Sequence, residues 1–193
     1  RDTDRSRGLG DVYKRQEIAS RNTAWANIIA RKLTGWGITP NQISMMSVFF
    51  ALAGCLLLTG TVIYPDFNKY VAYILFIVCM QSRLLCNLFD GMVAIEGGKK
   101  SANGDLYNDM PDRFADALFI IPVGYVAGGF GIELGWLAAL LAVMTAYFRW
   151  IGAYKTHQHF FNGPMAKQHR MALLTLTFVA VSYTHLRAHE TDQ

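Results

Sequence analysis

The chain is 193 residues long, and 52% of its residues are hydrophobic, 13% aromatic and only 17% charged. Because an average soluble domain carries about 25% charged residues, this composition argues against an ordinary soluble protein and favours a membrane protein. The net charge of +4 is modest, and we expect no nucleic-acid partner. The three cysteines, Cys55, Cys79 and Cys86, all lie in apolar runs, so we expect buried thiols and no disulfide.

The two ends of the chain differ from the sequence between them. Residues 1–16 are polar and lack periodicity, and residues 182–193 change abruptly from the apolar run before them. That run begins at Met171 and has only 12 residues, whereas about 20 are needed to cross a bilayer. We therefore expect one natural domain over residues 17–181, truncated at its C-terminus and flanked by two non-native tails. The alternative interpretation is a pair of disordered tails.

The first expected element is a helix from Trp25 to Trp36 that lies in the membrane interface. Its apolar residues occupy one face, Arg31 and Lys32 occupy another, and tryptophans suit the headgroup region. The sequence GITPNQIS then predicts a turn in which Thr39 or Asn41 caps the next helix. This first helix is either a plain anchor or a surface that docks on lipid, and we favour the anchor.

The hydrophobic runs that follow predict a bundle of membrane helices. They cover residues 44–63, 70–89, 114–130 and 132–148, and the short run at Met171 is the fifth. The turn GGFGIELG is short, so the third and fourth helices should be antiparallel neighbours. Gly124 and Gly128 permit close helix packing, either within the chain or in a homodimer. The predicted fold class is an all-α polytopic transmembrane bundle with an N-terminal interfacial helix.

Positive charge predicts the orientation of this bundle. The basic residues before the first span, between the second and third spans, and between the fourth and fifth spans all fall on one side. Because basic loops face the cytoplasm, we expect an integral protein of the bacterial inner (cytoplasmic) membrane. Its basic side, which also holds most of the acidic residues, would then face the cytoplasm.

Those acidic residues lie in the stretch NLFDGMVAIEGGKKSANGDLYNDMPDRFAD. Two stripes repeat at helical spacing, namely Arg83, Asn87 and Asp90 on the second span, and Asn108, Asp112 and Asp116 on the third. A glycine-rich loop between these spans can bring the stripes face to face. Pro111 is expected near the first turn of the third helix, where its missing N–H costs nothing.

An ionisable group within a membrane span costs about 2.5–3.5 kcal/mol on insertion scales, so several acids together need a compensating cation. Carboxylate and amide oxygens suit hard cations, and a magnesium site with few protein carboxylates is completed by water and substrate phosphates. The pattern therefore predicts a site for a hard divalent cation, Mg²⁺, Mn²⁺ or Ca²⁺ rather than Zn²⁺, that handles a diphosphate. Asp105 and Asp109 have the simpler interpretation of solvated residues near a helix N-terminus.

The same stretch resembles the signature of the CDP-alcohol phosphatidyltransferases, D-x2-D-G-x2-A-R-x8-G-x3-D-x3-D. The matching residues, all at the correct spacing, are Asp90, Gly91, Ala94, Gly104 and Asp112. Asn87 and Asn108 replace two aspartates of the signature, and Ile95 replaces its arginine. The segment ITPNQIS also resembles the family's TPN-x2-S/T entry to the first span. The resemblance covers residues 24–181.

This resemblance implies six transmembrane helices around a cytoplasm-facing cavity, of which about five are present here. It implies transfer of a phosphatidyl group from CDP-diacylglycerol to a small alcohol, with release of CMP and with Mg²⁺ or Mn²⁺ as cofactor. The implied catalytic base is Asp112. The implied metal ligands are Asp90, Asp112, Asn87 and Asn108, with Asp116 or Glu96 as a compensating carboxylate. The implied nucleotide- and substrate-binding residues are Gly91, Ala94, Gly104, Arg83, Lys99 and Lys100.

The acceptor side has less specific signals. Arg149, Lys167 and Arg170 are candidates to bind the phosphate of a phosphorylated alcohol, or they are positive-inside residues that meet anionic lipid headgroups. Whether the site holds one metal or two stays open, because Asn87 and Asn108 remove two formal charges. Two rival functions also stay open: a transporter or ion-pathway protein with charges lining a path, and a non-catalytic relative that binds metal or CDP-lipid.

Overall fold

The structure is a computed structural model of the whole chain, and it describes residues 23–64, 66–96, 104–156 and 167–191. Side chains are described in these ranges except at residues 96, 104–109, 150, 153–156, 167, 168 and 183–191. Within the described ranges the regular secondary structure is all α-helix, joined by short turns. The helices are α1 (Ala24–Gly35), α2 (Pro40–Ile63), α3 (Lys69–Glu96), α4 (Gly104–Ala127), α5 (Gly131–Thr156) and α6 (Lys167–Thr191).

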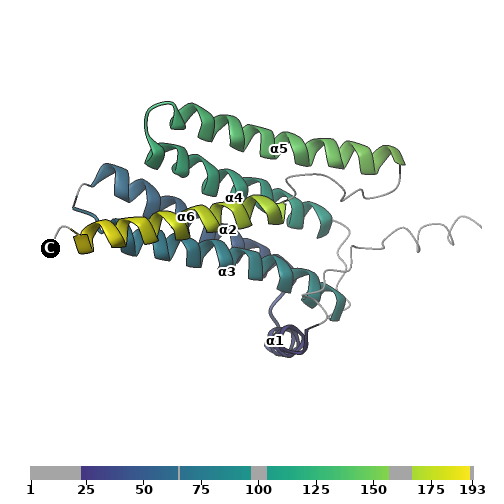
Figure 1. Cartoon of the computed structure of the whole chain (residues 1–193). Helices are drawn as coiled ribbons and strands as arrows, with labels where there is room; N and C mark the ends of the chain where they lie inside the picture. The colour runs from purple at the N-terminus through teal and green to yellow at the C-terminus, as the bar shows by residue number, and fades with distance from the viewer. Residues whose placement is uncertain (1–22, 65, 97–103, 157–166, 192–193) are drawn as a thin grey trace, which may run out of the picture.

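Helices α2 to α6 run side by side as a bundle, and α1 lies across one end of it, where Figure 1 shows it end-on. Helix α2 packs against both α3 and α4, α5 packs against α4, and α6 packs against α3. Helix α1 packs on α3 through Ala26 and Ala30, which are fully buried, and through an edge-to-face contact of Trp25 with Phe89. The bundle thus has one end that α1 covers in part and one end without it.

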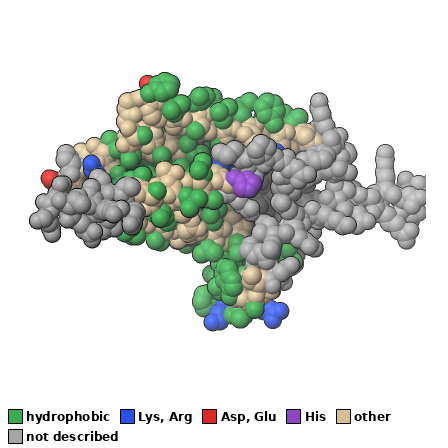
Figure 2. Space-filling view, viewed as in Figure 1, with side chains coloured by type: hydrophobic (Ala, Val, Ile, Leu, Met, Phe, Trp, Pro, Cys, Tyr) green, Lys and Arg blue, Asp and Glu red, His purple; other side chains and the backbone are tan. Residues whose placement is uncertain are grey.

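Among the described residues, three helices are long and apolar enough to cross a membrane: Pro40–Ile63, Lys69–Ile95 and Gly131–Arg149. They coincide with the first, second and fourth predicted spans, which confirms an all-helical chain with membrane-length helices. Helix α4 is not among them, and its first half carries Asp112, Arg113 and Asp116. Large apolar side chains such as Phe49 and Leu56 are exposed, and Figure 2 shows such side chains spread over the helices, as expected for surfaces that contact lipid.

The start of α2 follows from its sequence. Thr39 accepts a hydrogen bond from the backbone N–H of Gln42, and the Gln42 side chain accepts one from the backbone N–H of Thr39. This reciprocal pair satisfies two donors that the first turn leaves without a helical partner. Pro40 occupies the first helical position, where no N–H is needed. The prediction that Thr39 caps this helix is confirmed.

Two helix boundaries differ from the predictions. The third long helix begins at Gly104, well before the apolar run at residue 114, so Pro111 lies inside the helix and not near its first turn. Polar residues have only a weak preference against helix, and tertiary packing overrides it. Helix α6 runs from Lys167 to Thr191, so it begins before the predicted start at Met171. The domain boundary at residue 181 stays a prediction. Residues 1–16 lie outside the described ranges.

Aromatic rings from three helices form the core at the centre of the bundle. Phe76 of α3 packs on Phe119 of α4 at 5.5 Å and on Phe178 of α6 at 4.7 Å between ring centroids. Gly54 of α2 faces the same rings, and a Cβ there would lie 2.8 Å from the Phe119 side chain. This core holds α2, α3, α4 and α6 together, and so fixes the helix positions around the polar end described next.

Candidate functional site

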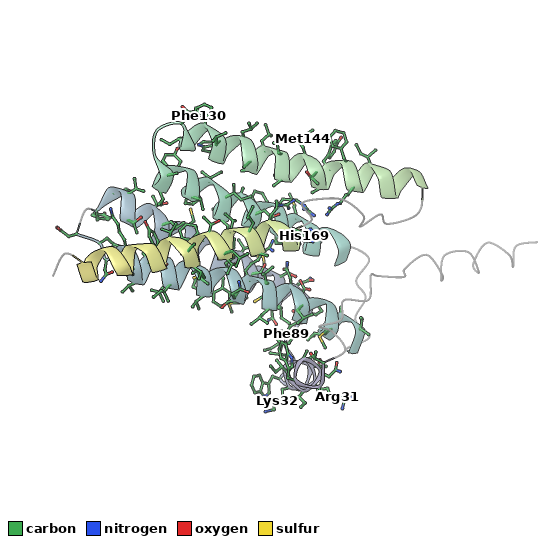
Figure 3. The ribbon with its side chains drawn as sticks, viewed as in Figure 1. Arg31, Lys32, Phe89, Phe130, Met144 and His169 are labelled. Atoms are coloured by element: carbon green, nitrogen blue, oxygen red, sulfur yellow. The ribbon has the colours of Figure 1, made fainter. Side chains whose placement is uncertain are left out.

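The polar residues singled out in the sequence gather at the end of the bundle that carries α1. They come from the second half of α3, the first half of α4 and the start of α6. In Figure 3 the labels of Phe89 on α3 and His169 on α6 mark this end. The antiparallel direction of α3 and α4 is what brings these sequence segments together, as the facing stripes predicted.

Arg83 is the centre of the cluster. Its side chain is fully buried, and its Nη2 donates to Oδ1 of Asp112 at 3.1 Å and to Oδ1 of Asp116 at 3.0 Å. The same nitrogen lies 3.3 Å from the backbone carbonyl oxygen of Asp112. The Nε and Nη1 groups of Arg83 are buried, and no hydrogen-bond partner for them lies among the described residues. A buried donor without a partner is costly, so these N–H groups are suited to an anionic ligand.

Asn87 lies one helical turn beyond Arg83 and faces the same acid. Its Nδ2 donates to Oδ1 of Asp112 at 2.9 Å. One carboxylate oxygen of Asp112 therefore receives both an arginine and an amide from α3, which orients the carboxylate. The predicted meeting of the α3 and α4 stripes is confirmed at these three residues.

Asp116 joins three helices. Its Oδ1 accepts from Arg83 of α3, and its Oδ2 accepts from Nη2 of Arg170 of α6 at 2.7 Å. Both carboxylate oxygens are thus engaged by arginines, and the exposed fraction of the Asp116 side chain is only 2%. In this arrangement Asp116 acts as an interhelical ion-pair partner, and its predicted role as a compensating metal ligand would require one arginine to move.

Asp90 lies near the end of α3 and is 4% exposed. Its Oδ2 accepts a hydrogen bond of 3.0 Å from the hydroxyl of Ser44 on α2. Phe89, Met92 and Ile43 form an apolar cluster around this pair together with the buried face of α1. Gly91 is buried beside Asp90 and Ala94 is half-buried, whereas Ile95, where the family signature has arginine, is exposed.

The donor chemistry fits a hard divalent cation in part. Asp90, Asn87 and Asp112 offer carboxylate and amide oxygens, the groups that Mg²⁺ and Mn²⁺ prefer. Within the described residues, however, no three acidic, histidine or cysteine side chains are grouped closely enough to hold a metal. An ion at this place would therefore depend on amide oxygens, water and substrate phosphates for the rest of its shell.

Several predicted site residues lie outside the part that the structure describes. Lys99 and Lys100 belong to residues 97–103, which are not described. The side chains of Asn108 and Lys167 are not described either, whereas Gly104 is described as the first residue of α4. Arg149 is half-buried at the end of the apolar part of α5. Its charge interacts with those of Arg170 and Arg113, so arginines of α4, α5 and α6 share one region of this end.

The structure also adds a residue that the search for carboxylates missed. Ser44 is the serine of the TPN-x2-S/T segment, for which the sequence predicted only a role in starting the first membrane helix. A serine near the end of a membrane helix can form hydrogen bonds with several nearby backbone groups. The spacing of neighbouring residues therefore does not predict its contact with Asp90, 46 residues away.

Comparisons with known proteins supply no family assignment. No model of a known protein family matches the sequence, and no curated protein matches it. The functional inference therefore depends on the residues and their geometry.

Proposed function

We propose that this chain is a metal-dependent CDP-alcohol phosphatidyltransferase that moves a phosphatidyl group from CDP-diacylglycerol to a small alcohol. The observation that carries the proposal is the pairing of Asp112 with Asn87 and Arg83 across α3 and α4. Asn87 and Asp112 stand at signature positions, Arg83 lies one helical turn before Asn87 on α3, and the three side chains meet at one buried place. Such a gathering of charge in a membrane bundle is costly and favours a functional site.

The proposed reaction assigns Asp112 as the general base. Its carboxylate takes the proton of the acceptor hydroxyl, and the acceptor oxygen attacks the β-phosphorus of CDP-diacylglycerol. The bond between that phosphorus and the oxygen bridging to the α-phosphorus breaks, and CMP leaves with this oxygen. The product is a phosphodiester lipid. Bound Mg²⁺ or Mn²⁺ would stabilise charge on the diphosphate and on the leaving CMP.

The remaining residues take supporting roles in this proposal. Asp90, Asn87 and Asn108 would hold the metal through oxygen atoms. Arg83 orients Asp112, and its nitrogens Nε and Nη1 would donate to a substrate phosphate. Helix α1 would rest on the cytoplasmic membrane surface beside this end.

The acceptor in this proposal is a phosphorylated alcohol. Arg149 of α5, Arg170 of α6 and Arg113 of α4 are close enough for their like charges to act on one another. Like charges repel unless an anion compensates them, and arginine binds phosphate well through its fixed set of donors. Asp116 pairs with one of these arginines, Arg170, and an acceptor phosphate would join this group of charges.

The test is release of CMP from CDP-diacylglycerol by the purified protein in liposomes, with Mg²⁺ or Mn²⁺ and with phosphorylated or unphosphorylated alcohols. We expect metal-dependent release that requires a phosphorylated alcohol. Asp112→Asn keeps the shape of the side chain but removes the base, so the rate should fall at least about 100-fold. Asp66→Asn, at an exposed acid near the opposite end, is the matched control and should keep wild-type activity.

Two outcomes would contradict the proposal in different ways. Wild-type activity in Asp112→Asn would remove Asp112 from the chemistry. If no alcohol supported CMP release, the transferase would be excluded, and retained binding of CDP-diacylglycerol would then favour the non-catalytic relative.

A further inference from the structure

Ser44 differs from the other hydroxyl residues of α2 in what it contacts. Ser47, Thr59 and Thr61 each donate to a backbone carbonyl oxygen of their own helix. Such bonds are the ordinary way in which a helix satisfies a hydroxyl. Ser44 has a carbonyl of this kind within reach, that of Pro40 at 3.2 Å, but it also lies 3.0 Å from Oδ2 of Asp90 on α3.

A hydroxyl has one proton, so Ser44 can donate fully to only one of these two acceptors. The carboxylate is the stronger acceptor, because hydrogen bonds to ionised groups are about twice as strong as neutral ones. Both side chains are almost completely buried, with 4% exposure for each residue. The contact is therefore protected from competing water, and it holds the orientation of the Asp90 carboxylate.

The surroundings keep Ser44 at this place. The Thr39–Gln42 capping pair and Pro40 set the first turn of α2, and Ser44 follows one turn later. Next to it, Ile43 packs against Phe89 and Met92, which flank Asp90 on α3. Thus the cap fixes the helix start, the apolar cluster fixes the approach of α2 to α3, and the hydroxyl reaches the acid.

We propose that Ser44 is a positioning residue for Asp90, which it holds in the orientation that binds the divalent cation. This inference rests on the proposed function, since it takes Asp90 as a metal ligand. Ligating carboxylates depend on hydrogen-bonded partners for their orientation, and loss of such a partner typically costs 10- to 100-fold in metal affinity or activity. The TPN-x2-S/T segment would then serve the site as well as the helix start.

The test measures Mn²⁺ binding by electron paramagnetic resonance in the purified protein, and CMP release as a function of Mn²⁺ concentration. Ser44→Ala should raise the Kd for Mn²⁺ about tenfold and raise the Mn²⁺ concentration for half-maximal activity by a similar factor. Ser44→Thr keeps the hydroxyl and should restore both. Ser47→Ala removes a fully buried hydroxyl one turn along the same helix, and it should change neither.

A double variant separates positioning from general damage to the fold. In an Asp90→Asn background the carboxylate is gone, so adding Ser44→Ala should produce no further loss of Mn²⁺ affinity. An equal loss in both backgrounds would overturn the proposal, as would unchanged Mn²⁺ affinity in Ser44→Ala or absence of Mn²⁺ binding by the wild type.

The same experiment distinguishes failure of this inference from failure of the proposed function. If Mn²⁺ binds and Ser44→Ala weakens it, but no alcohol supports CMP release, Ser44 positions Asp90 in a protein that is not the transferase. If the wild type releases CMP while Ser44→Ala binds Mn²⁺ with normal affinity, the proposed transferase activity is supported and the positioning role of Ser44 is excluded.

Discussion

Two regions of this molecule hold helices together by opposite means. At the polar end, Arg83 and Arg170 join α3, α4 and α6 through the two oxygens of Asp116. In the hairpin of α4 and α5, the two helix backbones meet at glycines, which have no side chain. A Cβ on Gly124 would lie 2.5 Å from the carbonyl oxygen of Gly131 and 3.0 Å from Cα of Gly135.

The difference supports the proposal that the polar end has a function beyond stability. Close backbone packing of small residues is the usual way to join membrane helices without charge. The chain uses that solution in the hairpin, where it suffices. Buried ion pairs are seldom more stabilising than apolar packing. The cluster at the other end therefore fits the proposed function better than a role in fold stability; it comprises Arg83, Asn87, Asp112, Asp116 and Arg170.

The largest expected effect comes from removing Arg83. Arg83→Ala leaves Asp112 and Asp116 buried without their shared partner, which should lower the free energy of unfolding by about 3–5 kcal/mol and abolish CMP release. Arg83→Lys keeps the charge but not the planar set of donors, so it should recover only part of the stability. Unfolding by SDS in mixed micelles measures the change, and Arg31→Ala, at an exposed site, is the control.

A small effect of Arg83→Ala would contradict the contrast with the glycine hairpin, because the stability of the polar end would then not depend on its charges.

An intermediate effect is expected in the glycine hairpin. Gly124→Ala places a methyl group against the backbone of α5, so α4 and α5 must separate, at about 1–3 kcal/mol for overpacking of this kind. Gly152→Ala adds the same methyl on α5, where no described atom beyond the neighbouring turns of that helix lies within 4 Å of the new Cβ, and it should cause no loss of stability. The same SDS titration applies. The folded fraction of Gly124→Ala should keep its CMP release and its metal dependence, and a loss of both would show that the hairpin geometry also sets the site.

The smallest expected effect concerns a neutral link between α3 and α6. Gln81 donates to the hydroxyl of Thr175 at 2.9 Å at an exposed position. Interhelical hydrogen bonds in membranes average about 0.6 kcal/mol, so Gln81→Leu should be nearly silent. A double-mutant cycle with Thr175→Val isolates the contact. A coupling energy as large as the loss in Arg83→Ala would mean that charge is not what distinguishes the polar end.

Much of this architecture could be predicted from local patterns. Apolar runs of about membrane length located α2, α3 and α5. The segment GITPNQIS located the start of α2 with Thr39 or Asn41 as its cap, and Thr39 is the one observed. The spacing of Arg83 and Asn87 on one helix and of Asp112 and Asp116 on the next predicted that the two stripes could meet. The start of α4 could not be predicted, because its first residues are polar and Pro111 resembles a first-turn residue while lying inside the helix.

What the sequence by itself determined was therefore the set of helices and the face on which each acid lies, since both follow from a repeat of 3.6 residues along one chain segment. Only the tertiary structure decided the partners. Asp116 pairs with Arg170, 54 residues later, and Asp90 bonds Ser44, 46 residues earlier. Such contacts depend on how the aromatic core places whole helices, and no spacing within a single helix records that placement.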